Sequence, residues 1–187
     1  MPFEKNFGMY CLLGASVCAI TGAVMDLRSH RIPNWLTYSG IGIALLLRFV
    51  LGGWGDLKSG VAGMGLGTGI FFLFFLVRGL GAGDVKLMAA VSAWVGLDRT
   101  MSVVLATAVA GAILAMVYMV FYKRIFSTLR NVGSLLWFHI TSGMRTHPKL
   151  NLREQGTIRL PYGLAIAIGT LYVLISSTHP SGVIYGH

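Results

Sequence analysis

The sequence predicts an all-α membrane protein with six transmembrane helices in one domain, residues 1–187. Three observations predict this class: 55% of the 187 residues are hydrophobic, only 11% are charged, and the mean hydropathy is +0.73. This composition is too apolar for an ordinary soluble domain. Because no polar tract interrupts the chain, we expect a single integral-membrane domain with no separate soluble domain.

The predicted spans are the runs of uncharged residues that can cross about 30 Å of hydrocarbon, which takes roughly 20 residues. Four runs have this length: 7–25, 59–77, 100–122 and 160–178. A fifth run, 35–51, is interrupted only by Arg48, which lies near its end. We expect the aliphatic part of Arg48 to let its guanidinium snorkel to the interface.

The segment at 85–97 is shorter, because its residues make a helix of only about 20 Å. If it crosses, all basic residues lie on one side except Lys5, Arg48, Lys58 and Arg99. The positive-inside rule then places both termini in the periplasm and assigns three loops to the cytoplasm: 26–34, 78–86 and 123–159. Without this crossing the most basic loop would change sides, so we expect six crossings.

The net charge of +9 is distributed by membrane side and is not gathered in a basic soluble domain. This pattern predicts contact with anionic lipid at the cytoplasmic face and no nucleic-acid partner. In the most basic loop, residues 123–145 place apolar side chains at helical spacing between basic ends. That spacing predicts a cytoplasmic interfacial amphipathic helix, or a lid.

Glycines at small-xxx-small spacing occupy residues 60–69. Gly63 pairs with Gly67 in this way, and Gly65 pairs with Gly69. Such spacing lets helices approach closely in lipid, so we expect both pairs to pack against another helix.

Two of the six acidic residues are predicted to meet the membrane at one level on the cytoplasmic side. Asp84, in "GLGAGDVKLMAA" (79–90), starts the short segment, so it is expected below the surface, where Gly81 and Gly83 would permit irregular backbone. Asp26, in "MDLRSHRIPN" (25–34), follows the first span. Simpler roles are an N-terminal helix cap for Asp84 and a solvated pair with Arg28 for Asp26.

Together these two stretches resemble a known family. "GAGD" (81–84) matches the glycine-x-glycine-aspartate motif of intramembrane aspartyl proteases, and an aspartate shortly before "IPN" (32–34) is the companion motif of bacterial type IV prepilin peptidases. The six-span layout and "RLPYG" (159–163) are also similar to that family. The resemblance implies Asp26 and Asp84 as the catalytic pair, with supporting residues Gly81, Gly83, Lys86, Pro33, Asn34, Pro161 and Gly163.

The resemblance implies that the protein removes the short basic leader of type IV prepilins or pseudopilins at the cytoplasmic face of the bacterial inner membrane. Larger family members carry a cytoplasmic insertion, often with paired CxxC motifs, and methylate the new N-terminus. The loop after the first predicted span is short and has no Cys, which favours the small peptidase-only type of tight-adherence (Flp) or type IVB pilus systems. N-methyltransferase activity is therefore doubtful, and no cofactor is expected.

A carboxylate pair can hydrolyse a peptide without a metal, since an ionised member deprotonates water while a protonated member polarises the scissile carbonyl. The helix dipole favours the ionised form at a helix start, which favours Asp84 over Asp26 as the base. The alternative is a small ion-coupled transporter in which Asp26 and Asp84 bind protons or cations at a broken helix. A transporter would show uptake without proteolysis, and the sequence has no obvious inverted repeat.

Overall fold

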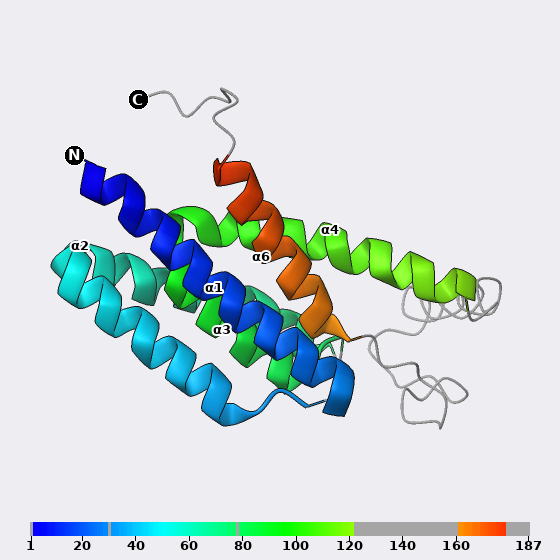
Figure 1. The fold of residues 1–187 in the computed structure, drawn as a ribbon. Helices are drawn as coiled ribbons and strands as arrows, with labels where there is room; N and C mark the ends of the chain where they lie inside the picture. Colours follow the sequence, from blue (N-terminus) through cyan, green and yellow to red (C-terminus); the bar gives the residue numbers. More distant parts are fainter. Residues whose placement is uncertain (1, 30, 78, 122–160, 179–187) are drawn as a thin grey trace, which may run out of the picture. The chain divides into compact units, whose positions relative to one another are not determined.

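The computed structural model of the chain describes residues 2–29, 31–77, 79–121 and 161–178. Every element in these ranges is an α-helix, which confirms the all-α class. The helices are α1 (Pro2–Ser29), α2 (Asn34–Leu76), α3 (Ala82–Val95), α4 (Leu97–Phe121) and α6 (Tyr162–Thr178) (Figure 1).

The chain divides into two compact units, residues 1–111 with 161–187 and residues 112–160. The packing described below belongs to the first unit. The interfacial helix predicted at 123–145 lies outside the described residues, and the single domain over 1–187 stays a prediction.

In the part of the chain that the structure describes, three helical segments are long and apolar enough to cross a membrane: Phe7–Ser29, Asn34–Leu76 and Leu97–Tyr118. The apolar helix α6 is shorter. Large apolar side chains are exposed along these helices, among them Val17, Leu73 and Val109. Exposed apolar surface of this extent is typical of contact with lipid or with another protein. The positions of the predicted helices are confirmed, whereas the number of crossings stays a prediction.

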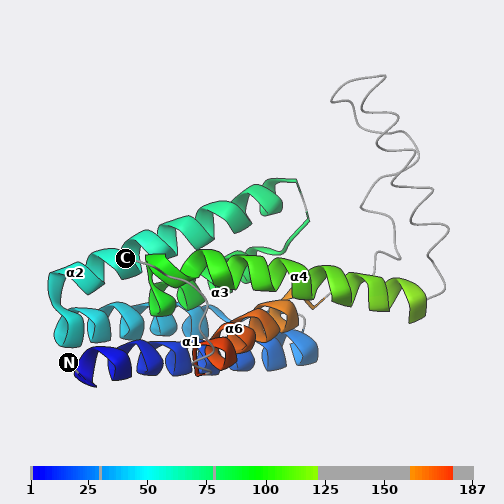
Figure 2. The same ribbon diagram turned by 90° about the horizontal axis from the view of Figure 1, so that it is seen from above.

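Helix α2 is interrupted at Gly53. Its 43 residues would extend about 65 Å as a straight helix, twice the thickness of the hydrocarbon. Gly53 has φ 71° and ψ −163°, a conformation that only glycine adopts at low cost. The two halves of α2 turn back beside each other there (Figure 2), with Leu45 and Arg48 of the first half against Gly60 of the second. They correspond to the predicted runs 35–51 and 59–77.

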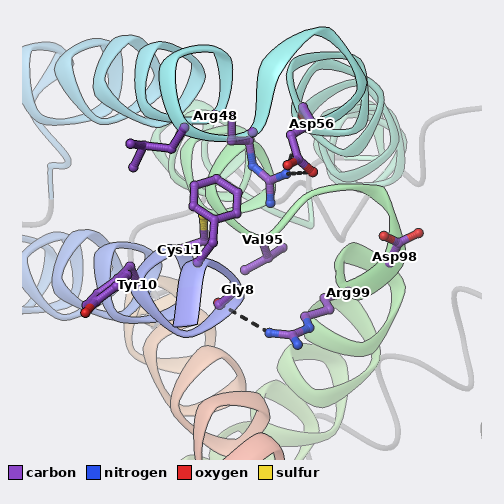
Figure 3. Close-up of a pocket in the computed structure, with 11 residues that line it drawn as sticks. Gly8, Tyr10, Cys11, Arg48, Asp56, Val95, Asp98 and Arg99 are labelled. Carbon is purple, nitrogen blue, oxygen red and sulfur yellow. Dashed lines mark hydrogen bonds and ion pairs between the residues drawn. The ribbon is translucent and has the colours of Figure 1, made fainter. Parts of the chain in front are cut away.

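Arg48 does not snorkel to the interface as expected, since its exposed fraction is only 5%. Its Nε and Nη2 donate to the backbone carbonyl of Trp94 at 3.1 and 2.7 Å. Its Nη1 lies 3.8 Å from Oδ1 of Asp56 (Figure 3). The last carbonyls of a helix lack intrahelical donors, so the end of α3 supplies the acceptors that make burial of this charge tolerable. Arg48 therefore links the end of α3 to the turn in α2.

The glycines at 60–69 differ in what they face. A Cβ at Gly63 would lie 2.6 Å from the carbonyl carbon of Gly96, and a Cβ at Gly67 would lie 2.9 Å from Cβ of Ser92. Gly65 and Gly69 have no such neighbour within 4 Å. The packing prediction is therefore confirmed for Gly63 and Gly67 and wrong for Gly65 and Gly69, which the helical turn places on the open face.

This difference predicts unequal effects of adding one methyl group. Gly63→Ala should lower the free energy of unfolding by about 1–3 kcal/mol, because the backbone after α3 has no room for it. Gly65→Ala should leave stability unchanged or raise it by up to about 1 kcal/mol, since alanine favours the helix. Thermal unfolding of both variants in one detergent measures the difference. Equal melting temperatures would contradict this assignment of the α2–α3 contact.

Candidate active site

Asp84 lies in the first turn of α3. Gly81 precedes the helix in an extended conformation, with φ −83° and ψ 153°. The Gly81 backbone N–H donates to Oδ2 of Asp84 at 2.9 Å. The N-cap residue is therefore Gly81, and Asp84 binds its backbone from the third position of the helix, instead of being the N-cap itself as considered from the sequence. No described residue donates a hydrogen bond to the other carboxyl oxygen. Asp84 is only 9% exposed, and nearly all of α3 beyond it is buried.

Asp26 lies near the end of α1 and contacts the start of α6. Its Oδ2 accepts a hydrogen bond from the backbone N–H of Gly163 at 3.1 Å. A Cβ at Gly163 would lie 3.0 Å from Cβ of Asp26, so a side chain there would displace the carboxyl group. Helices α1 and α6 pack side by side in Figures 1 and 2. The pairing with Arg28 considered from the sequence is not formed among the described residues.

The packing of α1 on α3 brings the two acids to one level. Gly22, one turn before Asp26, packs against Leu87, nearly one turn after Asp84. A Cβ at Gly22 would lie 2.7 Å from the Leu87 methyl carbons, so the helices approach closely at this turn. Asp26 is near enough for its charge to act on the Asp84 carboxyl group. The structure therefore places the two acids that the sequence selected within electrostatic range of each other.

Lys86 contacts the start of α2 and not the acids. Its Nζ donates to Oδ1 of Asn34 at 2.9 Å and lies 5.7 Å from the ring centroid of Tyr38. Two residues turn a helix by about 200°, so Lys86 and Asp84 face opposite sides of α3. Pro33 precedes α2 in an extended conformation, with φ −71° and ψ 143°. Pro33, Asn34 and Lys86 therefore position the start of α2 against α3.

The other two supporting residues shape backbone. Gly83 lies inside the first turn of α3, so the irregular backbone expected there is wrong; a Cβ at this position would be 3.3 Å from Ile32. Pro161 directly precedes α6, and its carbonyl accepts the N–H of Leu164 at 3.1 Å. Gly81 and Gly163 are thus the supporting residues whose backbone N–H groups bind the two acids.

Sequence reasoning missed Tyr162, the residue between Pro161 and Gly163. Its ring is half-buried, and a Cβ at Gly111 of α4 would lie 2.9 Å from its hydroxyl oxygen. The charge of Asp84 also acts on this side chain. The motif "RLPYG" contained the signal, but an aromatic residue at the start of a span is usually an interfacial anchor.

A separate pocket of about 460 Å³ lies at the opposite ends of α1 and α3 (Figure 3). Its lining includes Gly8, Cys11, Arg48, Val95 and Arg99, and neither Asp26 nor Asp84 contributes to it. Arg99 donates to the Gly8 carbonyl at 3.4 Å. Over the described ranges, no cluster of three or more His, Cys, Asp or Glu side chains could hold a metal ion.

Comparison with known proteins identifies the family. Residues 13–116, more than half of the chain, match the type IV leader peptidase family, and the chain belongs to it. The matched region contains both Asp26 and Asp84 and ends before α6.

Curated relatives include two proteins named prepilin leader peptidase/N-methyltransferase. The protein from Burkholderia pseudomallei (strain K96243) is 32% identical over 122 residues, 62% of this chain and 39% of the relative. The protein from Escherichia coli (strain K12) is 29% identical over 136 residues, 63% of this chain and 60% of the relative. The chain thus spans only part of the length of these relatives. No solved structure matches it.

Family membership and the long apolar helices indicate an integral protein of the inner membrane. The family match and the relatives give no support to the ion-coupled transporter considered from the sequence.

Proposed function

We propose that the protein is a membrane-embedded aspartyl endopeptidase that removes the leader peptide of type IV prepilins or pseudopilins, with Asp26 and Asp84 as its catalytic pair. The observation that carries the proposal is that these two acids lie at one level of the α1–α3 contact, within electrostatic range of each other. They come from the end of α1 and the start of α3, and each accepts a hydrogen bond from a backbone N–H at a helix start. Both lie within the region that matches the leader peptidase family.

The chemistry needs one proton shared between two carboxyl groups. Neighbouring carboxylates in a poorly hydrated site resist double ionisation, so one is protonated while the other is charged. The charged member takes a proton from water as the water oxygen attacks the scissile carbonyl carbon, and the protonated member donates to the carbonyl oxygen. The tetrahedral intermediate then collapses, the C–N bond breaks, and the amine leaves with a proton.

The backbone contacts leave each acid able to do this. Asp26 and Asp84 each use one oxygen, Oδ2, for their bond to a backbone amide. No described residue donates a hydrogen bond to their Oδ1 atoms. These oxygens are therefore available to water and to the substrate carbonyl.

The proposed topology has six crossings: α1, both halves of α2, α3, α4 and α6. The turn at Gly53 supports counting α2 twice. The basic residues then place both termini in the periplasm and the loops 26–34, 78–86 and 123–159 in the cytoplasm. The carboxyl pair lies at the cytoplasmic side, where a prepilin presents its basic leader. Anionic lipid is the expected neighbour of the basic loops, and nucleic acid is not a partner.

The proposed activity is proteolysis alone, without a cofactor. The relatives are named as N-methyltransferases as well as peptidases. Here the chain passes from α1 to α2 within residues 30–33, which contain no cysteine and leave no room for an inserted domain. This supports a peptidase of the small type, with doubtful N-methyltransferase activity.

Neutralising either acid should abolish cleavage. Asp26→Asn and Asp84→Asn keep the shape of the side chain but cannot exchange the catalytic proton, so neither should shorten a purified prepilin. Asp98→Asn is the matched control, because Asp98 is exposed at the start of α4. Mass spectrometry of the product measures cleavage, and membrane extraction checks insertion. Near wild-type cleavage by either Asn variant at the acid pair would refute the proposal.

The wild-type rate should have a bell-shaped dependence on pH. Acid protonates the member that acts as base, and alkali removes the proton from the member that acts as acid. Cleavage should also persist in EDTA, because no step uses a metal. A rate that EDTA abolished and zinc restored would contradict the two-carboxylate chemistry.

The supporting residues should affect activity through position. Gly163→Ala places a methyl group against Asp26, and because a shift of about 1 Å can cost 10²-fold, kcat should fall by roughly tenfold to 10²-fold. Gly69→Ala, in open space on α2, should leave kcat unchanged. Asn34→Ala removes the bond to Lys86 and should lower activity less than loss of Asp26 does. If correctly folded Asn34→Ala were as inactive as Asp26→Asn, Asn34 would belong to the catalytic set.

The topology can be tested by cysteine labelling. Cys11 and Cys18 are buried and unpaired, so both can first be replaced by alanine to give a silent background. A single cysteine added at the C-terminus should react with an impermeant reagent in whole spheroplasts. A cysteine at Ser134 should react only after the membrane is opened. The reverse pattern would exclude the six-crossing topology.

A further inference from the structure

Three contacts along the first half of α6 set the position of Tyr162. The next residue, Gly163, donates its backbone N–H to Asp26. The phenol lies against Gly111 of α4, where an added Cβ would be 2.9 Å from the hydroxyl oxygen and 3.1 Å from the carbon that bears it. Two turns further along α6, Gly169 packs against the backbone of Thr107, which also lies on α4. These contacts fix the ring against α4, one residue before the amide that binds Asp26.

The Tyr162 hydroxyl has no hydrogen-bond partner among the described residues. It is not one of the fully buried polar atoms without partners, which are Ser92 Oγ, Trp94 Nε1 and Thr107 Oγ1, so the oxygen keeps some exposed surface. Its side chain is half-buried and within electrostatic range of Asp84. Tyr172, on the same helix, is instead 64% exposed, as expected of a residue that faces lipid or an interface.

We propose that Tyr162 is a further catalytic residue, whose hydroxyl donates a hydrogen bond to the carbonyl oxygen of the scissile peptide bond. The inference rests on the proposed peptidase function. That oxygen gains negative charge as water attacks, and a donor fixed in advance stabilises the charge without reorganisation. Tyr162 keeps its proton throughout and forms no covalent bond. It complements the protonated carboxyl group, which approaches the same oxygen.

Tyr162→Phe tests the hydroxyl alone, because the ring that packs on Gly111 is kept. Loss of one such donor costs about 10²-fold or more in kcat, so we expect kcat for a synthetic prepilin peptide to fall by roughly 10²-fold with little change in KM. Tyr172→Phe is the matched control and should keep the wild-type kcat. Melting temperatures of both variants in detergent should equal that of the wild type.

A second variant distinguishes the hydroxyl from packing. Gly111→Ala adds a methyl group against the Tyr162 oxygen and should displace it, lowering kcat in the wild-type background. In the Tyr162→Phe background the hydroxyl is already absent, so Gly111→Ala should lower kcat much less. Such non-additivity is the signature of two changes that act through one group.

Four outcomes would overturn the inference. If Tyr162→Phe kept kcat within about threefold of the wild type while Asp84→Asn was inactive, the proposed function would stand and the role of Tyr162 would not. Equal losses from Gly111→Ala in both backgrounds, or a change confined to KM, would assign Tyr162 to packing or substrate binding. If the wild-type protein cleaved no prepilin, the proposed function would fail and this inference with it.

Discussion

The short helix α3 is the constraint on which the rest of the structure depends. Its 14 residues make about 20 Å of helix, roughly 10 Å less than the hydrocarbon it would have to cross. Arg48 binds its carbonyl end at the level of the turn in α2 and of the first residues of α1 and α4 (Figure 3). In the proposed six-crossing topology, fixing that end places the shortfall at the other end, where Asp84 lies. The recessed position proposed for Asp84 thus follows from helix length and one buried arginine.

Close packing of the helices brings the residues of the candidate site together. In lipid, apolar surface supplies no driving force between helices, so association depends on packing and hydrogen bonds. Gly22 lets α1 approach α3, Gly63 and Gly67 let α2 approach the α3 end, and Gly163 lets α6 meet Asp26. The acids come from helices that are far apart in the sequence, and their level is set by these contacts and not by a loop.

The sequence predicted the helices well because the length of an apolar run is a local property. It also selected Asp26, Asp84 and the motif residues around them. That selection came from a family resemblance, which says nothing of how these residues are arranged in space. Arg48 could not be placed, because its acceptor at Trp94 lies 46 residues away. Gly65 was indistinguishable from Gly63, since small-xxx-small spacing does not say which face meets a helix. The bond from Gly163 to Asp26 joins residues 137 positions apart.

The same long-range bond changes the electrostatic argument about the acids. From the sequence, Asp26 ends a helix, where the dipole disfavours its charge, and Asp84 starts one, where the dipole favours it. In the structure both carboxyl groups receive a backbone N–H from a helix start, Asp84 from α3 and Asp26 from α6. The positive ends of two helix dipoles therefore converge on the pair. They offset part of the cost of keeping one negative charge in a poorly hydrated site, and they do so for either acid. In the proposed mechanism the helix dipoles would thus favour one negative charge on the pair without assigning the proton, and the substrate and water that complete the site would set which acid is the base.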